Sequence, residues 1–412
     1  MALIVQKFGG TSVADVDRIR HVATHIQREV KAGNQVIVTV SAMAGTTDRL
    51  VGYVKEMSDL LDDAAWSEHD FVVASGEQIT SGLLALCLQS MGINARSFSG
   101  WQIPFNTDAA HGRARIAEIK TEAIRKTLDE GSVAVVAGFQ GISEHGRVTT
   151  LGRGGSDTTA VALAAAFDAD RCDIYTDVDG VYTCDPRIVG KARKLDMISY
   201  EEMLEMASLG AKVLQTRSVE MAMKYGVRVQ VLSTFDENDG TLLVDEEEIV
   251  EQQVVTGIAY SRDEARITLT NVENVPGVSA SIFGPLADRG INVDMIVQNV
   301  TEDGKRTDVT FTVPKGDMQH TIESVKTAKR TPQFEKLHSD DGVAKVSVIG
   351  TGMRSHAGVA ADMFRTLAEK NINIIVITTS EIKVSVLIEE EYLELALRAL
   401  HTSYGLDAVE EE

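Results

Sequence analysis

The first part of the chain alternates short runs of β-branched residues with longer segments that have the apolar spacing of helices. The strand-like runs are not interrupted by polar residues, so both faces of each strand are expected to be covered. This pattern predicts an α/β domain with a mostly parallel sheet between helix layers. The predicted strands cover residues 2–8, 35–41, 133–138, 172–176 and 227–232, and the predicted helices cover 13–32, 79–88, 157–167 and 200–225.

The last third of the chain repeats itself. Gly277 and Gly358 stand 81 positions apart, as do Asn292 and Asn373. Each copy has the pattern of a strand, a helix, two strands and a second helix, which predicts two βαββαβ units of the ferredoxin-like α+β type. Tandem units of this size usually bind a small ligand or mediate assembly. The predicted strands are 266–269, 293–298, 308–313, 344–349, 374–379 and 383–388, and the second helices are 317–328 and 391–401.

An acidic segment separates these parts. Five of the seven residues in 245–251 are acidic, which is typical of a solvated linker or an exposed helix, and it is also a candidate hinge. We therefore predict an α/β domain over 1–244, an acidic linker with an extra strand over 245–262, and α+β units over 263–341 and 342–412.

Composition narrows the possible partners. The 412 residues include 40 Lys and Arg against 61 Asp and Glu, a formal net charge of −21. This charge argues against binding to nucleic acid or to an anionic membrane, and any anionic substrate needs a local site of cations and amides. Three separated cysteines fit free thiols in a reducing compartment. No apolar run approaches the ~18 residues of a membrane span, and no signal segment is evident, so we expect a cytoplasmic protein.

Two glycine-rich turns are candidates for holding anions. Lys7 and the pair Gly9 and Gly10 join a strand to a helix, where backbone amides and the helix dipole favour a phosphate, although many strand–helix joins use such a turn. The P-loop pattern is absent. The stretch 151–159 places Arg153 among three glycines, which fits recognition of a carboxylate or phosphate. Ser156 or Asp157 could instead act only as a helix cap.

Three further positions have both a functional and a purely structural interpretation. The aspartates in 176–187 follow a strand, where ligands bind in open α/β sheets, and they either hold Mg²⁺ or shape a turn. Glu77 lies at the start of a helix. Its carboxylate either interacts favourably with the positive end of the helix dipole or binds the ammonium group of a ligand. Lys212, predicted inside an apolar helix, either belongs to the functional site of the α/β domain or is an ordinary lysine whose ammonium group extends to solvent.

These motifs together resemble the bacterial aspartokinases. The resemblance covers nearly the whole chain, because that family combines a three-layer αβα amino-acid kinase domain with two ACT domains. The segment 176–187 is similar to the nucleotide loop of amino-acid kinases generally, whereas the other motifs point to aspartokinase and, at this length, to the form without a fused homoserine dehydrogenase. The segments that carry the resemblance are 7–12, 41–43, 75–77, 138–141, 151–157, 176–187 and 209–212.

The resemblance implies a reaction and a set of site residues. L-Aspartate and ATP with Mg²⁺ would give 4-phospho-L-aspartate and ADP, the first step toward lysine, threonine, methionine and diaminopimelate. Lys7, Asp157 and Lys212 would be catalytic. ATP would contact Lys7, Phe8, Gly9, Gly10, Thr176, Asp177, Tyr182, Asp185, Arg187 and Lys212. Aspartate would contact Ser41, Thr47, Glu77, Arg153, Gly154, Gly155 and Ser156, and no residue is assigned to the metal.

The resemblance also gives the repeats a role. In the family, ACT pairs dimerise and bind lysine, threonine or both as inhibitors, and some members also contain a shorter subunit with only the repeats. The implied effector residues are Gly277, Val278, Ala280, Asn292, Val293, Gln298, Asn373 and Ile374, although the glycines could simply shape turns.

Two alternatives remain open. One is another kinase of the same fold acting on a different amino acid or a nucleotide. The other is a catalytically silent amino-acid sensor that uses only the ACT repeats, against which the presence of Lys7, Asp157 and Lys212 argues.

Overall fold

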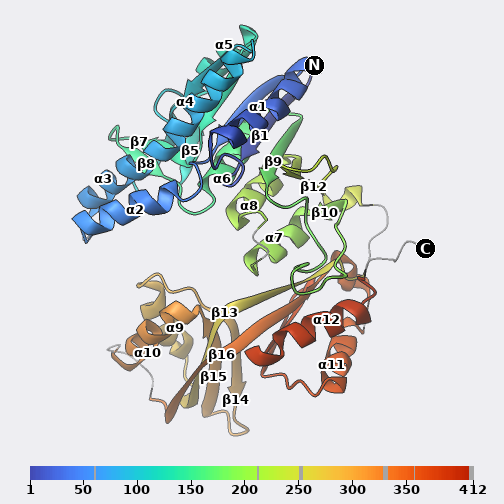
Figure 1. Ribbon diagram of the computed structural model, residues 1–412. Coiled ribbons are helices and arrows are strands. Elements are labelled where there is room, and N and C mark those ends of the chain that lie inside the picture. Colours follow the sequence, from blue (N-terminus) through green and yellow to red (C-terminus); the bar gives the residue numbers. More distant parts are fainter. Residues whose placement is uncertain (60–61, 211–212, 250–253, 328–332, 357, 408–412) are drawn as a thin grey trace. The chain divides into compact units, whose positions relative to one another are not determined.

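The computed structural model describes all residues except 60–61, 211–212, 250–253, 328–332, 357 and 408–412 (Figure 1). The chain forms two compact units. The first contains Met1–Val181, Lys194–Ser208 and most of the chain up to residue 249, and the second contains Tyr182–Arg193 and the C-terminal part.

An eight-stranded sheet forms the centre of the first unit. Its strand order is β10-β12-β11-β9-β1-β2-β6-β3, and the β11–β12 pair is its antiparallel exception. The parallel strands β9, β1, β2 and β6 therefore have their carboxyl ends at one edge of the sheet. The bounds are β1 Leu3–Phe8, β2 Gln35–Val40, β3 Ala95–Phe98, β6 Val133–Ala137, β9 Arg171–Thr176, β10 Met197–Ser199, β11 Val229–Ser233 and β12 Thr241–Val244.

Helices cover both faces of this sheet, as the apolar strand runs predict. Phe8, Val36 and Val38 face α1 (Val16–Lys31) and α4 (Ser75–Ser90) in one buried cluster. On the other face, α6 (Gly155–Phe167) packs against β1, β2 and β9, and almost all of its residues are buried. Residues 160–167 of this helix are apolar on every side, which is typical of a buried helix. The remaining helices are α2 Thr46–Met57, α3 Asp63–Val73, α5 Glu122–Asp129, α7 Tyr200–Ser208 and α8 Thr216–Tyr225.

A second, four-stranded sheet completes the first unit. Its order is β5-β4-β7-β8, with bounds β4 Phe105–Thr107, β5 Ile116–Ile119, β7 Gln140–Ser143 and β8 Val148–Thr150. The strands have three or four residues each, too short for the periodicity of the sequence to reveal them. The sheet matters for function because β8 leads directly into the glycine turn before α6.

Two predicted helices differ in extent. The helix expected over 13–32 begins at Val16, because the Asp15 side chain accepts a hydrogen bond from the Arg18 amide at 2.8 Å and caps it. The single helix expected over 200–225 was wrong: the structure has α7 and α8, separated by a break in which Gly210 has a φ of +107°. A left-handed residue cannot continue a right-handed helix.

The second unit contains both βαββαβ repeats on one six-stranded sheet, β14-β15-β13-β16-β18-β17. Two long strands are shared: the start of β13 pairs with the end of β16, and the end of β13 pairs with the start of β16. Each repeat thus receives its fourth strand from the long strand of the other. The bounds are β13 Gly257–Glu273, α9 Val278–Ala287, β14 Asp294–Val300, β15 Arg306–Val313, α10 Met318–Thr327, β16 Lys336–Ile349, α11 Val359–Glu369, β17 Val376–Thr379, β18 Lys383–Glu389 and α12 Leu393–Ser403, with single 3₁₀ turns at Lys315–Asp317, Thr351–Ser355 and Glu390–Tyr392.

The segment Tyr182–Arg193 packs within this second unit, although it follows a strand of the first. Cys184, Val189 and Ala192 belong to the same buried cluster as Val346 and Leu397 of the C-terminal repeat. Burial raises the pKa of the Cys184 thiol to about 12, so this cysteine is an inert core residue.

The acidic segment is largely exposed where it is described. Glu246–Glu248 form a 3₁₀ turn, η1, and Glu248 makes an ion pair with Arg228. Residues 250–253 of the predicted linker lie outside the described residues. The domain bounds given above therefore remain a prediction.

One helical run in the described part of the chain, Ala64–Ser90, is long and apolar enough to cross a membrane by length and composition alone. Half of its most apolar window is buried inside the fold, and a core helix of a soluble protein passes the same test. The run contains no long uninterrupted apolar stretch, because Ser, Thr, Gln and charged residues occur along it, and this is why the sequence pattern predicted no such run.

Candidate active site

A cavity of about 530 Å³ opens in the first unit, where the carboxyl ends of β1 and β2 meet the start of α6. Ligands bind at this edge in open parallel sheets, because the strands end there and the helices begin. Ten of the sequence-predicted residues line the cavity together: Lys7, Gly10, Ser41, Thr47, Glu77, Arg153, Gly154, Gly155, Ser156 and Asp157.

A buried ion pair lies at this cavity. Lys7 Nζ of β1 is 2.6 Å from Asp157 Oδ1 in the first turn of α6, and each side chain is only 10 % exposed. Gly9 makes room for this lysine, since a Cβ at that position would lie 3.3 Å from Nζ. Asp157 therefore fixes the direction of a cation at the start of a helix, where anions are favoured.

Glu77 provides an unusual acid in the same cavity. It is 3 % exposed, and its Oε1 accepts a hydrogen bond from the Ala42 amide at 3.1 Å. Its Oε2 is buried and has no partner among the described residues. Burial raises the pKa of Glu77 to about 7. A half-satisfied buried carboxylate is the arrangement that an incoming ammonium group would complete.

Arg153 supplies a cation for an anionic group of a ligand, whereas Glu77 supplies an anion for a cationic group. It is exposed and forms no ion pair in the part of the chain that the structure describes, although it lines the cavity. Gly154 caps α6 with a φ of +70°, so neither Ser156 nor Asp157 is the cap that the sequence allowed. The turn leaves Arg153 free to meet a carboxylate.

Four other predicted residues of the first unit contact neighbouring residues of the protein. Phe8 is fully buried and stacks on Tyr175, with ring centroids 4.6 Å apart, and the Gly9 amide donates to the Tyr175 carbonyl at 3.3 Å. Thr176 Oγ1 donates to Asp177 Oδ1 at the end of β9. These contacts do not test whether the same residues bind ATP, so their roles in ATP binding remain predictions.

The other nucleotide candidates lie in the second unit. Arg187 Nε and Nη2 donate to Asp185 at 3.0 and 2.8 Å, and the Tyr260 hydroxyl donates to Asp185 Oδ2 at 3.0 Å. The Arg187 guanidinium holds the pKa of Asp185 below its usual range. Tyr182 packs against the buried cluster of the C-terminal repeat. Lys212, predicted to be catalytic, lies outside the described residues.

The predicted effector residues gather in two parts of the second unit. Gly277, with a φ of +91°, caps α9, and Val278 is buried in its first turn. Ala280 lies in the same helix, and the remaining positions lie on or beside β14 and before β17. Met295 of β14 and Val376 of β17 share one buried cluster, which brings these edge strands together. The residues near these edge strands are Asn292, Val293, Gln298, Asn373 and Ile374.

One wall of the cavity was missed from the sequence. Trp66, His69 and Val73 line it together with Glu77. Their spacing of three, four and four residues puts them on one stripe of the α3–α4 run, which could have been found by extending the helical pattern backward from Glu77. The rest of the lining that the prediction lacked consists of Ala42, Met43, Ala44, Gly45, Asp48, Val51, Gly112, Phe139, Thr150 and Gly152.

Models of known families match three parts of the chain. The model of the amino acid kinase family matches residues 2–233, and two ACT domain models match residues 266–329 and 346–404. The fold and the cavity thus define an amino acid kinase followed by two ACT domains, which confirms the predicted fold class.

Full-length relatives narrow this class. An aspartate kinase of Pseudomonas putida is 53% identical over 409 residues, covering 99% of this chain and 98% of its own, and an aspartokinase of Pseudomonas aeruginosa is 54% identical over 410 residues, with the same coverage. The crystal structure of Escherichia coli aspartokinase III in complex with aspartate and ADP has a TM-score of 0.81 and 29% identity, covering 97% of this chain and 99% of its own. The chain belongs to the aspartokinase family, as its motifs indicated.

Proposed function

We propose that this chain transfers the γ-phosphoryl group of ATP to the side-chain carboxylate of L-aspartate, giving 4-phospho-L-aspartate and ADP. The observation that carries the proposal is the combination in one cavity of the Lys7–Asp157 pair with Glu77, whose Oε2 lacks a partner in the described part of the chain. The first can accept an anionic phosphoryl group and the second an ammonium group.

The amino acid would be held at three points. Glu77 takes its ammonium group, Arg153 takes its α-carboxylate, and Ser41, Thr47 and Ser156 add hydrogen bonds around it. The side-chain carboxylate is then directed toward Lys7. An ionised carboxylate is already a competent nucleophile at neutral pH, so the reaction requires no general base.

The chemical step is chiefly a problem of charge. Two anions 4 Å apart repel by roughly 4 kcal/mol at an effective dielectric constant near 20. Lys7 and Lys212 would neutralise the moving phosphoryl group, and Asp157 would keep Lys7 directed. The glycine turn at Gly9–Gly10 would bring backbone amides to the phosphates. Phosphoryl transfer depends on such positioning and charge stabilisation.

ATP and Mg²⁺ are the proposed cofactors. Thr176, Asp177, Tyr182, Asp185 and Arg187 are the proposed side-chain contacts of the nucleotide. The described residues contain no group of three His, Cys, Asp or Glu that could hold a metal ion by itself. The proposed magnesium ion would therefore enter with ATP and be held mainly by phosphate oxygens and water. When bound, it would neutralise phosphate charge.

We also propose regulation by end products and assembly through the ACT units. Lysine, threonine or both would bind at the α9 and β14–β17 positions named above, and Escherichia coli aspartokinase III has been crystallised in complex with lysine and aspartate (TM-score 0.76). Exposed apolar side chains on the edge strands, Ile296, Val300 and Ile377, fit a homo-oligomeric contact. A shorter ACT-only subunit and a cytoplasmic location belong to the same proposal.

Trapping of the acyl phosphate with hydroxylamine tests the reaction. Wild-type protein with ATP should form a hydroxamate from L-aspartate and not from L-glutamate, and it should not consume UMP. Turnover of glutamate or UMP instead would identify another kinase of this fold. Absence of turnover with all three would favour the silent amino-acid sensor.

A further inference from the structure

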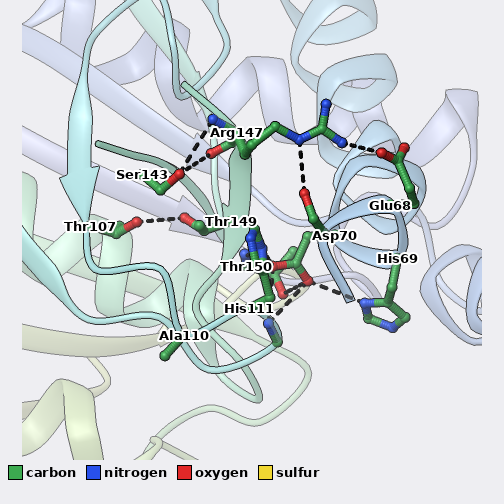
Figure 2. Close-up of polar contacts among 12 residues, drawn as sticks. Glu68, His69, Asp70, Thr107, Ala110, His111, Ser143, Arg147, Thr149 and Thr150 are labelled. Carbon is green, nitrogen blue, oxygen red and sulfur yellow. Dashed lines mark hydrogen bonds and ion pairs between the residues drawn. The ribbon is translucent and has the colours of Figure 1, made fainter. Parts of the chain in front are cut away.

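Asp70 of α3 is a fully buried carboxylate outside the cavity. It accepts hydrogen bonds from four residues of three separate segments, as Figure 2 shows for His69, His111 and Thr150. The Thr150 amide and hydroxyl donate at 2.8 and 2.6 Å, the Gly112 amide at 3.0 Å, and the Nδ1 atoms of His111 and His69 lie at 3.0 and 3.1 Å. So many donors suit an acceptor-only carboxylate.

The segments that Asp70 joins also pair with each other. The Ala114 amide donates to the Thr150 carbonyl at 2.9 Å. Arg217 Nη1 donates to the carbonyls of Ala114 and Leu151 at 3.0 and 2.9 Å. Asp70 and Arg217 thus hold the same pair of segments, 110–114 and 148–152, which we call the platform. The platform ends one residue before Arg153.

The platform also forms part of the cavity wall. Gly112 and Thr150 both line the cavity, as do Trp66 and His69 on the helix that carries Asp70. Gly112 has a φ of +76°, and a Cβ there would lie 2.8 Å from Cζ3 of Trp66. The loop therefore lies directly against the helix, and a change in the bonds of Asp70 would shift both sides of the wall.

We propose that Asp70 is a positioning residue for aspartate binding: it holds the platform from which Arg153 meets the substrate carboxylate, without touching the substrate itself. This inference rests on the proposed function, because it takes the cavity as the aspartate site. An amide in place of the carboxylate would present an N–H group to at least one of the surrounding donors. Such a mismatch would loosen the platform while preserving the volume of the side chain.

The alternative is that Asp70 only contributes to stability. Asp173 of β9 provides a matched control, since it is also a fully buried carboxylate of the first unit, is held by Arg171 and does not line the cavity. A purely structural role would make Asp70→Asn and Asp173→Asn behave alike.

The test measures the KM for aspartate, the KM for ATP and the melting temperature of wild type, Asp70→Asn and Asp173→Asn. Asp70→Asn should raise the KM for aspartate about tenfold or more, with the KM for ATP changed less than twofold. Asp173→Asn should lower the melting temperature and leave both KM values near wild type. Equal changes in the two KM values, or an unchanged KM for aspartate, would overturn the proposal.

A milder variant keeps the test informative if Asp70→Asn does not fold. His111→Leu removes one donor to Asp70 from a residue that does not line the cavity, and it should raise the KM for aspartate several-fold without changing that for ATP. No change in the KM for aspartate would count against the proposal. Wild-type turnover of aspartate in the same assay separates this outcome from a failure of the proposed function.

Discussion

Lys7 and Asp157 show how a chain with a net charge of −21 can provide a site for anions. The cation is nearly buried, and its counter-ion holds it in one direction. Replacement of Lys7 by Ala should lower kcat about 10²-fold to 10³-fold, because the stabilisation of the moving phosphoryl group is lost. Initial rates of ADP release with aspartate measure this. A kcat within threefold of wild type, in a variant with unchanged circular dichroism, would show that Lys7 is not required.

Glu77 should make both the stability of the protein and the binding of aspartate depend on pH. Its folded-state pKa of about 7 lies above the ordinary value of 4.5, so the stability that its protonated form contributes is complete below pH 4.5 and is lost as the pH rises through 7. This difference corresponds to roughly 3 kcal/mol. Binding of an ammonium group needs the ionised form. The KM for aspartate should therefore fall as the pH rises from 6 to 8.

Glu77→Gln isolates this effect. The variant should have a higher KM for aspartate that varies little with pH, and without substrate it should melt above wild type at pH 8. If wild type and variant showed the same pH profile for the KM, Glu77 would not be the ammonium ligand.

At the scale of elements, the sequence predicted those strands, helices and repeats that produce a periodic apolar pattern or a recognisable glycine pattern. The parallel strands and the two repeats followed from uninterrupted apolar runs and an 81-residue offset. The sequence pattern did not predict the short strands β4, β5, β7 and β8, because a strand of three or four residues is too short to show a periodicity. It also did not predict the break before α8, because this break depends on the backbone conformation at Gly210. Asp70 was missed for a similar reason: apart from His69, its partners are 41 or more residues away in sequence, and no local pattern reveals them.

The turn before α6 provides a prediction for an element. Gly154→Ala should cost about 2 to 4 kcal/mol in the free energy of unfolding, because a Cβ there would lie 1.9 Å from Cγ of Gln215 in addition to the strain of a φ of +70°. Gly146→Ala is the control, with the same φ and open space around it, and should cost about 1 kcal/mol. Denaturant unfolding compares the two variants. Equal losses would mean that the contact with Gln215 has no effect.

For the whole molecule, the notable feature is that the segment with Tyr182, Asp185 and Arg187 packs in the core of the ACT unit. Tyr260→Phe removes one hydrogen bond to Asp185 and should raise the KM for ATP about threefold to tenfold, with little effect on the KM for aspartate. Tyr404→Phe is the control, because it removes a hydrogen bond to the Val359 carbonyl in the same core. Parallel changes in both variants would indicate a general loss of packing.

The central claim is that one cavity of the kinase unit brings aspartate to the phosphates of ATP with its cations and Glu77. A crystal structure with ADP and aspartate bound tests it most directly. We expect the ammonium group at Glu77, the α-carboxylate at Arg153, and Lys7 with Lys212 directed at the phosphates. Aspartate bound outside this cavity, or both lysines directed away from the nucleotide, would contradict the claim.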